Sequence, residues 1–403
     1  MNFKFGVLGL VAVSLLLASG NAKKHSSKRH LDVWLTNKAR SFLMTTVNTF
    51  TGKLVEAAFN KTQDSYTICP IIVWSMLTKI SDLSGGQTKE QLEDFLNWKN
   101  TSWHRLGLAS LYRRYHHFKN MEVNSTGLIV IDKSVDLTDK NSDHLREIKI
   151  VNVDFSKTDE AYNIINKRAE ENSDHLINEI IPKGKFEKDY RMVIANGGFI
   201  RGIWAVPFYP ETSKTPFQLL DGTKKEVDMM RARGIFPIGY LNPDYSAKII
   251  QLDYLWDNYN TAVNNYLVIP EEDVGFDKVE KLLYNFDFSN FEVDEVANIN
   301  LLMPKFKLET SVELKKPLND IGVTKIWSKE SDLSGFSKNT YVNEFFHKTG
   351  IVVDPFFNEK TKSYIAPKGP VTNVVVDKPF FWITVSDHGV VILFSRITNP
   401  AYQ

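Results

Sequence analysis

The chain has 403 residues, and its 49 lysines and arginines nearly balance 48 aspartates and glutamates, so the formal net charge is +1. This balance gives no overall field that would favour nucleic acid as a partner, and a hydrophobic share of 43% is typical of an ordinary globular protein. Cys69 is the only cysteine, which excludes an internal disulfide, so the fold must be stabilised by burial alone. Its neighbours Ile68 and Pro70 predict a buried, unreactive thiol.

The N-terminus predicts export from the cell. Lys4 precedes an apolar run over residues 5–17, and small residues at 18–22 supply a cleavage site, which is the pattern of a secretory signal peptide. The run is too short to span a membrane. We therefore expect residues 1–22 to be removed and the mature protein to be secreted and extracellular, without a membrane span. Residues 23–36 are expected to form an N-terminal tail, and its basic stretch over residues 23–30 is expected to be disordered.

Helical patterning comes first along the mature chain, and strands follow. Apolar residues at helical spacing predict helices over residues 37–59, 70–80, 88–96, 105–118 and 160–179, and the second half is mostly strand-like. Thr88 with Gln91 predicts a capping box at the start of the third helix. No linker interrupts residues 37–403, so we expect a single, monomeric α+β domain with mixed and antiparallel sheets.

A secreted chain can be N-glycosylated, and this sequence has three acceptor sequons. They place N-glycosylation candidates at Asn60, Asn100 and Asn124, each in polar surroundings.

The sequence carries none of the short motifs of several common enzyme classes. It has no His-Glu-x-x-His, no paired cysteine motif and no Gly-x-Ser-x-Gly. His116 and His117 are adjacent, so on a helix they point in different directions and cannot share one metal ion. We therefore expect no enzymatic activity, no catalytic residues and no metal or other cofactor.

Several segments resemble one protein family in register. Residues 193–208 resemble the serpin signature Asn-Ala-x-Tyr-Phe-Lys-Gly-x-Trp-x-x-Pro-Phe, beginning at Asn196. The further segments that resemble serpins are residues 69–72, 86–92, 212–230, 302–310, 332–336 and 392–400. The resemblance covers essentially the whole mature chain, so it implies the serpin fold, with an exposed reactive-type loop at about residues 355–373.

The loop departs from what the family's mechanism requires. Serpins, as a family, trap serine proteases when the cut reactive loop inserts into the main sheet, and small hinge residues allow this insertion. The corresponding hinge here consists of Pro355, Phe356, Phe357 and Asn358. Proline lacks the N–H that a sheet strand needs, and large side chains overpack a narrow space at a cost of about 1–3 kcal/mol per site.

Serpins carry a polar cluster under the main sheet, and this chain matches only part of it. Asn196 and His347 match it, whereas Cys69 and Ile72 stand where the family carries serines. We expect Asn196 and His347 to be satisfied polar groups of a stable core rather than parts of a sheet that is ready to open.

These departures predict a secreted serpin-fold protein that does not inhibit proteases and acts as an extracellular binding protein. Two alternatives remain open from the sequence. One is inhibition of an extracellular trypsin-like serine protease, which would cut the loop near Lys360, Lys362 or Lys368. The other is carriage of a ligand, as in some serpins.

A predicted helix over residues 105–118 concentrates positive charge. The candidate binding residues are Arg105, Arg113, Arg114 and Lys119, which directly follows the helix. By order along the chain, this helix corresponds to the one that carries heparin sites in some serpins. A heparin-like glycosaminoglycan is therefore a second expected partner, and a basic face that only contacts solvent is the alternative.

Overall fold

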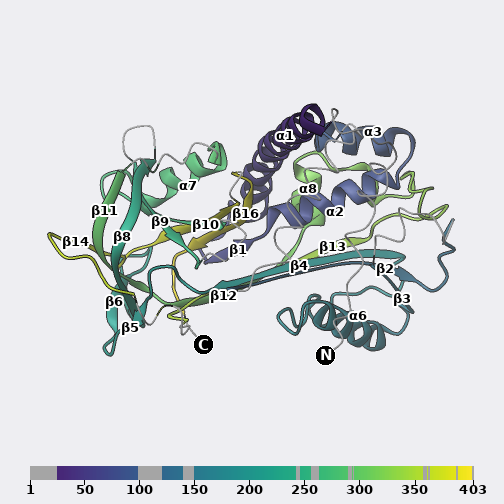
Figure 1. Cartoon of the computed structure of the whole chain (residues 1–403). Coiled ribbons are helices and arrows are strands. Elements are labelled where there is room, and N and C mark those ends of the chain that lie inside the picture. The colour runs from purple at the N-terminus through teal and green to yellow at the C-terminus, as the bar shows by residue number, and fades with distance from the viewer. Residues whose placement is uncertain are drawn as a thin grey trace, which may run out of the picture.

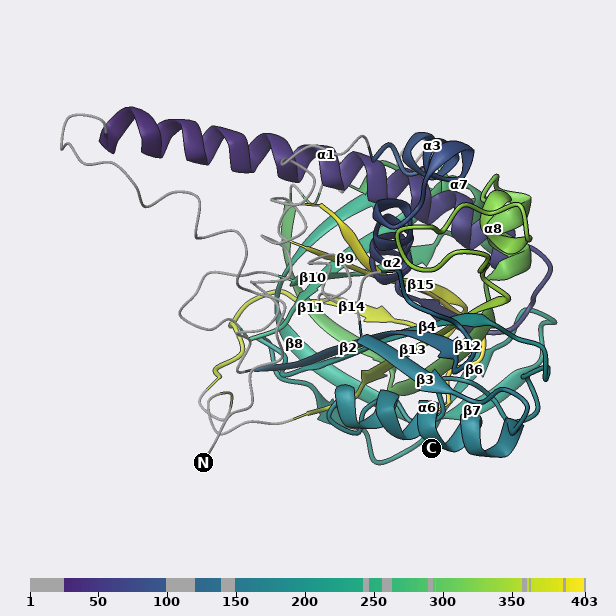
Figure 2. The same cartoon turned by 90° about the vertical axis from the view of Figure 1, so that its right-hand side faces the viewer.

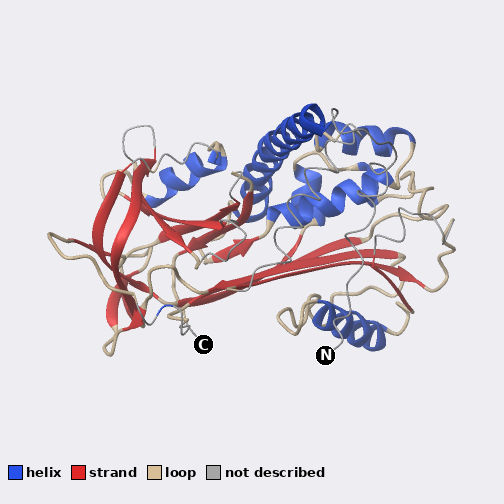
Figure 3. Cartoon of the chain, viewed as in Figure 1, coloured by secondary structure: helices blue, strands red, loops and turns tan. Residues whose placement is uncertain are grey.

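The computed structural model describes residues 25–98, 120–138, 149–241, 246–255, 263–288, 293, 295–356, 361, 364–386 and 389–401. Two large sheets and a small hairpin make up the described β-structure, and helices cover them (Figures 1 and 3). The α+β architecture expected from the sequence, with helices mainly in the first half and strands dominating the second, is confirmed. None of the described helices combines the length and the hydropathy needed to cross a membrane.

The first large sheet has five strands in the order β12-β13-β4-β2-β3. Their bounds are Phe306–Glu313 for β12, Glu344–Val353 for β13, Met192–Gly202 for β4, Met121–Asp132 for β2 and Lys149–Val153 for β3. β13 is parallel to β4 and β2 is parallel to β3, whereas the other neighbours are antiparallel. Two segments far apart in the sequence, β4 and β13, therefore meet at the centre of this sheet.

The second large sheet runs in the order β1-β16-β15-β10-β9-β8-β11-β14, and β5 also pairs with β8. The bounds are Tyr66–Ile68 for β1, Val391–Ile397 for β16, Phe380–Ser386 for β15, Val263–Pro270 for β10, Ala247–Asp253 for β9, Met229–Leu241 for β8, Glu295–Pro304 for β11, Thr372–Val375 for β14 and Tyr209–Pro210 for β5. The hairpin consists of β6 (Thr215–Gln218) and β7 (Lys224–Val227).

The described helices are α1 (His25–Phe59), α2 (Pro70–Asp82), α3 (Gly86–Phe95), α6 (Thr158–Asn172), α7 (Phe276–Tyr284), α8 (Lys315–Asp320) and the short 3-10 helix η2 (Lys325–Trp327). The helices predicted over residues 70–80 and 88–96 correspond to α2 and α3. The helix predicted over residues 105–118 lies outside the described residues.

The central strand β4 is buried on both faces, and this explains its sequence. Met192 and Ile194 belong to the larger core together with residues of α2, whereas Val193 and Ala195 belong to a smaller core with residues of α6. Figure 1 shows α2 and α6 on opposite sides of this sheet. A strand covered on both faces favours apolar side chains, so a polar residue such as Asn196 requires a buried partner.

Helix α1 is longer at its N-terminus than expected. It begins at His25 rather than at residue 37, and so it includes residues 25–30, which were expected to be disordered. This stretch holds no proline or glycine that would interrupt a helix. Figure 2 shows the first part of α1 extending beyond the body of the molecule.

The capping box expected at the start of α3 is wrong. The helix begins at Gly86, after an N-cap glycine without a side-chain cap, so Thr88 and Gln91 lie inside it. Their side chains bind another segment instead. The Thr88 hydroxyl accepts a hydrogen bond from the backbone N–H of Asp332, and the Gln91 carbonyl oxygen accepts from the backbone N–H groups of Thr324 and Lys325, each over 2.9 Å.

Helix α6 ends earlier than predicted, at Asn172 rather than at residue 179. Ser173 follows the helix, and its hydroxyl donates to the carbonyl of Ala169 while it accepts from the backbone N–H of Ile177. Asp174 and His175 then adopt positive φ angles of 49° and 65°, which a continuing right-handed helix does not allow.

Helix α1 passes very close to the end of α7, which predicts the effect of a substitution at Gly52. A Cβ atom at this position would lie 1.7 Å from the backbone oxygen of Tyr284. Gly52→Ala should therefore lower the free energy of unfolding by about 1–3 kcal/mol through overpacking, although alanine favours a helix by about 1 kcal/mol over glycine. Urea unfolding measures the change. Lys53→Ala, on the exposed side of the same turn, is the control, and a Gly52→Ala protein as stable as the wild type would contradict the close packing.

Candidate functional site at the loop hinge

A buried polar cluster joins the two central strands of the five-stranded sheet to the start of α2. His347 of β13 lies opposite Asn196 of β4, and its Nδ1 is 2.7 Å from Asn196 Oδ1. Asn196 Nδ2 donates to the carbonyl of Ile72 over 3.0 Å. On the other side of the ring, His347 Nε2 accepts from the backbone N–H of Cys69 over 3.2 Å and lies 2.7 Å from the Thr349 hydroxyl.

These partners fix the protonation state of His347. Nδ1 carries the proton because it faces the amide oxygen of Asn196, and Nε2 is an acceptor because it faces the N–H of Cys69. Burial lowers the pKa of His347 from 6.5 to about 3, so the ring is neutral at physiological pH. The prediction that Asn196 and His347 are satisfied core groups agrees with these contacts.

Cys69 lies at the start of α2 and is fully buried beside this cluster. Burial raises the pKa of its thiol to about 12, which keeps the thiol protonated. The prediction of a buried cysteine is confirmed. The cluster is thus built from a neutral imidazole, an amide, a hydroxyl and main-chain groups, and it holds the sheet against α2.

The five-stranded sheet is closed between β13 and β4. The two strands pair continuously from Glu344 opposite Val193 to Ile351 opposite Ile200. The segment that follows β13 therefore does not form a strand between them. This segment, residues 354–371, connects β13 to β14 and is called the β13–β14 loop below; its described residues are 354–356, 361 and 364–371.

The first residues of the β13–β14 loop are held against the end of β4. Arg201 of β4 forms an ion pair with the buried carboxylate of Asp354, with 2.6 Å between Nη2 and Oδ2. The same guanidinium lies 4.2 Å from the centre of the Phe356 ring. The indole N–H of Trp204 donates to the backbone oxygen of Asp354 over 2.8 Å. We call these four residues, Arg201, Trp204, Asp354 and Phe356, the hinge clamp.

Aromatic rings pack around Trp204 of the hinge clamp and hold it in place. Its ring packs against Phe208, Tyr254 and Trp382, with ring centres 4.7–5.8 Å apart, and Trp382 belongs to the second large sheet. Burial, with a smaller effect from the nearby Asp354 carboxylate, raises the pKa of Tyr254. The clamp therefore lies where the two large sheets meet.

The second half of the β13–β14 loop rests on the second large sheet. Tyr364 is half-buried over Gly234 of β8, where a Cβ would lie only 2.5 Å from the Tyr364 hydroxyl. Arg233 Nη2 donates to the carbonyl of Pro367 over 3.4 Å, and Asn298 Nδ2 donates to the carbonyl of Pro370 over 2.9 Å. β14 then continues the chain as a parallel neighbour of β11. The described part of the loop is therefore anchored at both ends.

The family model described as "Serpin (serine protease inhibitor)" matches residues 45–400 of this chain. The chain belongs to the serpin family. Its relatives include the "Leukocyte elastase inhibitor" of Bos taurus, which is 26% identical over 362 residues that cover 83% of this serpin and 92% of the relative.

Solved structures of other serpins share the fold. The mouse protein-Z dependent protease inhibitor superposes with a TM-score of 0.76 at 19% identity and covers 92% of this serpin and 100% of its own chain. Uncleaved ovalbumin superposes with a TM-score of 0.75 at 17% identity, over 88% of this serpin and 100% of its own chain.

The candidate residues that the sequence indicated in this serpin lie in different places, and some of them are outside the described residues. Pro355 and Phe356 lie half-buried at the hinge clamp, and Lys368 is exposed on the second half of the β13–β14 loop. The remaining hinge and loop candidates, Phe357, Asn358, Lys360 and Lys362, lie outside the described residues, as do the basic candidates Arg105, Arg113, Arg114 and Lys119. Among the described residues, no group of acidic, histidine and cysteine side chains could hold a metal ion.

The sequons occupy different surroundings. Asn60 is exposed just after α1, whereas Asn124 lies inside β2, where its amide nitrogen donates to Asp174 over 3.3 Å. Asn100 lies outside the described residues.

Sequence reasoning missed Arg201, Asp354, Arg233 and Tyr364. Arg201 stands where the family signature has lysine, and Asp354 directly precedes the hinge proline, so both positions were visible in the sequence. Their contact was not, because the two residues are 153 positions apart in the chain.

The buried His347 predicts how the stability of this serpin depends on pH. Its folded-state pKa of about 3 lies below the ordinary value of 6.5, so between these values the unfolded chain binds a proton that the folded chain does not. The free energy of unfolding should therefore fall as the pH drops from about 6.5 towards 3, by at most about 1.4 kcal/mol per pH unit from this residue. His347→Gln should show a shallower slope in denaturant unfolding measured across this range.

The matched control for this measurement is His175→Gln, because His175 is exposed and its ring pairs with Glu170 alone among the residues that the structure describes. This control should keep the wild-type slope. An unchanged slope in His347→Gln would show that His347 does not carry the pH dependence.

Proposed function

We propose that this serpin is a secreted, monomeric binding protein whose β13–β14 loop does not insert into the five-stranded sheet, so that it does not inhibit proteases by loop insertion. The observation that carries the proposal is the hinge clamp. An inserted strand would have to begin next to Val353 and enter between β13 and β4. The Arg201–Asp354 ion pair joins the end of β4 to the residue after β13, and so it crosses the place where that strand would enter.

Opening the sheet there would break contacts that are costly to lose. The Asp354 side chain is 8% exposed and that of Arg201 is 27% exposed, so the ion pair is only partly screened by solvent. A hydrogen bond to a charged group contributes about 1.5–3 kcal/mol, and the guanidinium contact with Phe356 adds to it. The entering segment would lose this clamp before it gained any strand pairing.

The residues of the hinge then pair poorly as a strand. Pro355 has no N–H to donate to a neighbouring strand, and Phe356 is a large side chain that already has a partner in Arg201. Slow insertion leaves an acyl-enzyme time to hydrolyse, so a protease would treat the loop as a substrate. The N-terminal signal pattern supports secretion, and the loop anchored at both ends supports a role in binding.

Protease inhibition is the second candidate function. The family description and the inhibitor names of the relatives favour it, and exposed Lys368 offers a bond that a trypsin-like protease could cut. Carriage of a small ligand is the weaker alternative.

Incubation with trypsin distinguishes the first two functions. We expect cleavage of the β13–β14 loop without an adduct that survives denaturing gel electrophoresis, because insertion is slower than hydrolysis of the acyl-enzyme. The cleaved protein should also melt within a few degrees of the intact one, since no strand is added to the sheet. A gel-stable adduct, or a rise of tens of degrees after cleavage, would establish inhibition by insertion instead.

A repaired hinge supplies the matched comparison. The variant combines Pro355→Glu, Phe356→Glu, Phe357→Gly, Asn358→Thr, Lys360→Ala and Lys362→Ala, which gives small or strand-compatible residues and leaves Lys368 to be cut. It should move towards a more stable cleaved form, whereas Pro355→Glu alone should not, because the bulky neighbours remain.

A glycosaminoglycan is a further proposed partner. If the basic residues of the predicted helix bind sulfate groups, retention on immobilised heparin should fall steeply with salt, because each neutralised sulfate releases counterions. The double variant Arg113→Ala with Arg114→Ala should elute at lower salt and leave the melting temperature unchanged, since exposed charges contribute little to stability. Identical elution of the variant and the wild type would assign these residues to a solvated face.

A further inference from the structure

The exposed face of β5, β8, β11 and β14 carries cationic and apolar side chains beside the β13–β14 loop, and we call it the outer face. Strand register places Arg233 of β8 opposite Asn300 of β11, and Asn300 beside Asn373 of β14. Arg231 lies opposite Leu302 in the adjacent row, and Leu302 lies beside Val375. Residues opposite one another in register point to the same face, so both arginines rise from this surface.

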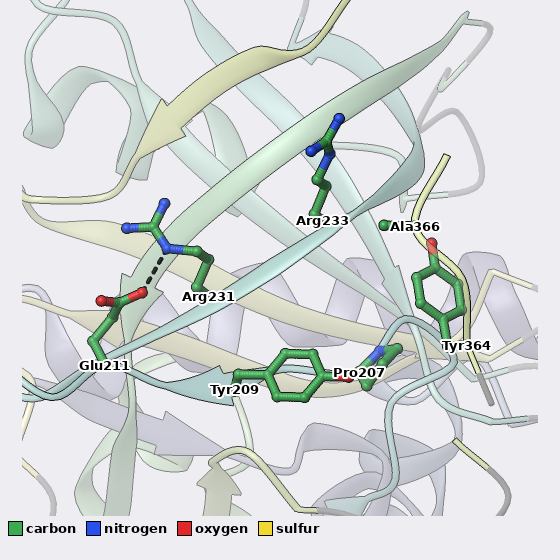
Figure 4. A pocket seen from close by; sticks show the side chains of 7 residues that line it. All are labelled: Pro207, Tyr209, Glu211, Arg231, Arg233, Tyr364 and Ala366. Atoms are coloured by element: carbon green, nitrogen blue, oxygen red, sulfur yellow. Dashed lines mark hydrogen bonds and ion pairs between the residues drawn. The ribbon is translucent and has the colours of Figure 1, made fainter. Parts of the chain in front are cut away.

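A hollow of about 170 Å³ opens between the outer face and the loop. Figure 4 shows Arg231 and Glu211 on one side of it, Tyr364 and Ala366 of the loop on the other, and Arg233 between them. This volume is well below the 300–1,000 Å³ or so that a drug-sized ligand needs, and so it suits a single side chain. The loop completes the hollow because its residues Tyr364 and Ala366 line it.

The two arginines differ in how their charge is balanced. Arg231 is paired with Glu211, with 2.5 Å between Nε and Oε1, and it also donates to Asn300 over 3.2 Å. Arg233 is exposed, donates only at 3.4 Å to the carbonyl of Pro367, and forms no ion pair with any residue that the structure describes. A guanidinium presents a planar fork of donors that matches a carboxylate. The chemistry that fits the hollow is therefore anionic.

The outer face and the loop also carry exposed apolar side chains, of which Tyr209 lines the hollow. The exposed fractions are 86% for Ile365, 70% for Val296, 52% for Tyr209, and 48% for both Ile235 and Val375. Exposed apolar groups that gather around polar anchors are typical of protein interaction sites. β14 is also the outermost described strand on this side of the sheet, so its edge can pair with an added extended segment.

We propose that the outer face binds an extended aliphatic segment of a partner protein, and that the hollow takes one carboxylate side chain of this segment onto the guanidinium of Arg233. The inference deepens the proposed binding function and rests on it, because the β13–β14 loop forms one wall only while it stays outside the five-stranded sheet. Charge complementarity selects the carboxylate, and the exposed aliphatic side chains elsewhere on the outer face and on the loop select a polypeptide over a free small anion.

Fluorescence anisotropy with a pair of labelled peptides tests the proposal. One peptide has the sequence Ser-Val-Leu-Glu-Val-Ser and the other replaces Glu with Gln, so the two differ only in the charge. We expect the Glu peptide to bind at least about tenfold more tightly, a difference of about 1.4 kcal/mol. Arg233→Ala should remove this preference, Arg233→Lys should retain part of it, and Lys224→Ala, on the exposed hairpin strand β7, should leave it intact.

Other outcomes would overturn the proposal. These are equal binding of the two peptides, no binding of the Glu peptide up to about 1 mM, or a preference that survives Arg233→Ala. Dimerisation in sedimentation experiments that disappears in Arg233→Ala would identify a second copy of this chain as the occupant instead. The trypsin experiment uses no peptide, so it tests the proposed function separately. If trypsin forms no gel-stable adduct and the Glu peptide does not bind, this binding site is rejected while the non-inserting function still stands.

Discussion

The pairing of β13 with β4 is the constraint on which the rest of this serpin depends. It holds together segments that are about 150 residues apart, and the His347–Asn196 contact at its centre links the sheet to α2. At its end, the Arg201–Asp354 ion pair continues the connection beyond the last paired residues. While this pair of strands is closed, the chain that leaves β13 must run outside the sheet, and the position of the loop follows from that.

Two departures from the family pattern lie next to the pairing of β13 with β4, one beside the buried polar cluster and one at the hinge. The family's function requires a sheet that opens and a hinge that fits the opening. Here Cys69 and Ile72 replace serines beside the buried cluster, and they contribute only backbone groups to His347 and Asn196. At the hinge, Pro355 lacks the N–H that a strand needs, and Phe356 has a cation as its partner. Both changes support the proposal that the sheet stays closed.

The described residues at the two ends of the β13–β14 loop present a defined surface. Its first residues are fixed by the hinge clamp, and its later residues contact β8 and β11 through Tyr364, Pro367 and Pro370. Order in these residues of the free protein would lower the entropy cost for a partner that binds there. The same contacts bring Arg233 into the wall of the hollow, so the geometry that restrains the loop also shapes the outer face.

The sequence by itself determined the family and the α+β class, because these depend on motifs and periodicities that are local in the chain. It also identified Pro355 and Phe356 as unsuited to a strand, since the properties of proline and of a large ring do not depend on context. Contacts between distant segments were decided only by the tertiary structure. Thr88 and Gln91 formed a plausible capping box, yet their side chains bind the segment around residues 324–332, because tertiary partners outcompete a local cap. Arg201 and Asp354, and likewise Arg233 and Tyr364, acquire their roles only when the fold brings β4, β8 and the loop together, and no local pattern records that proximity.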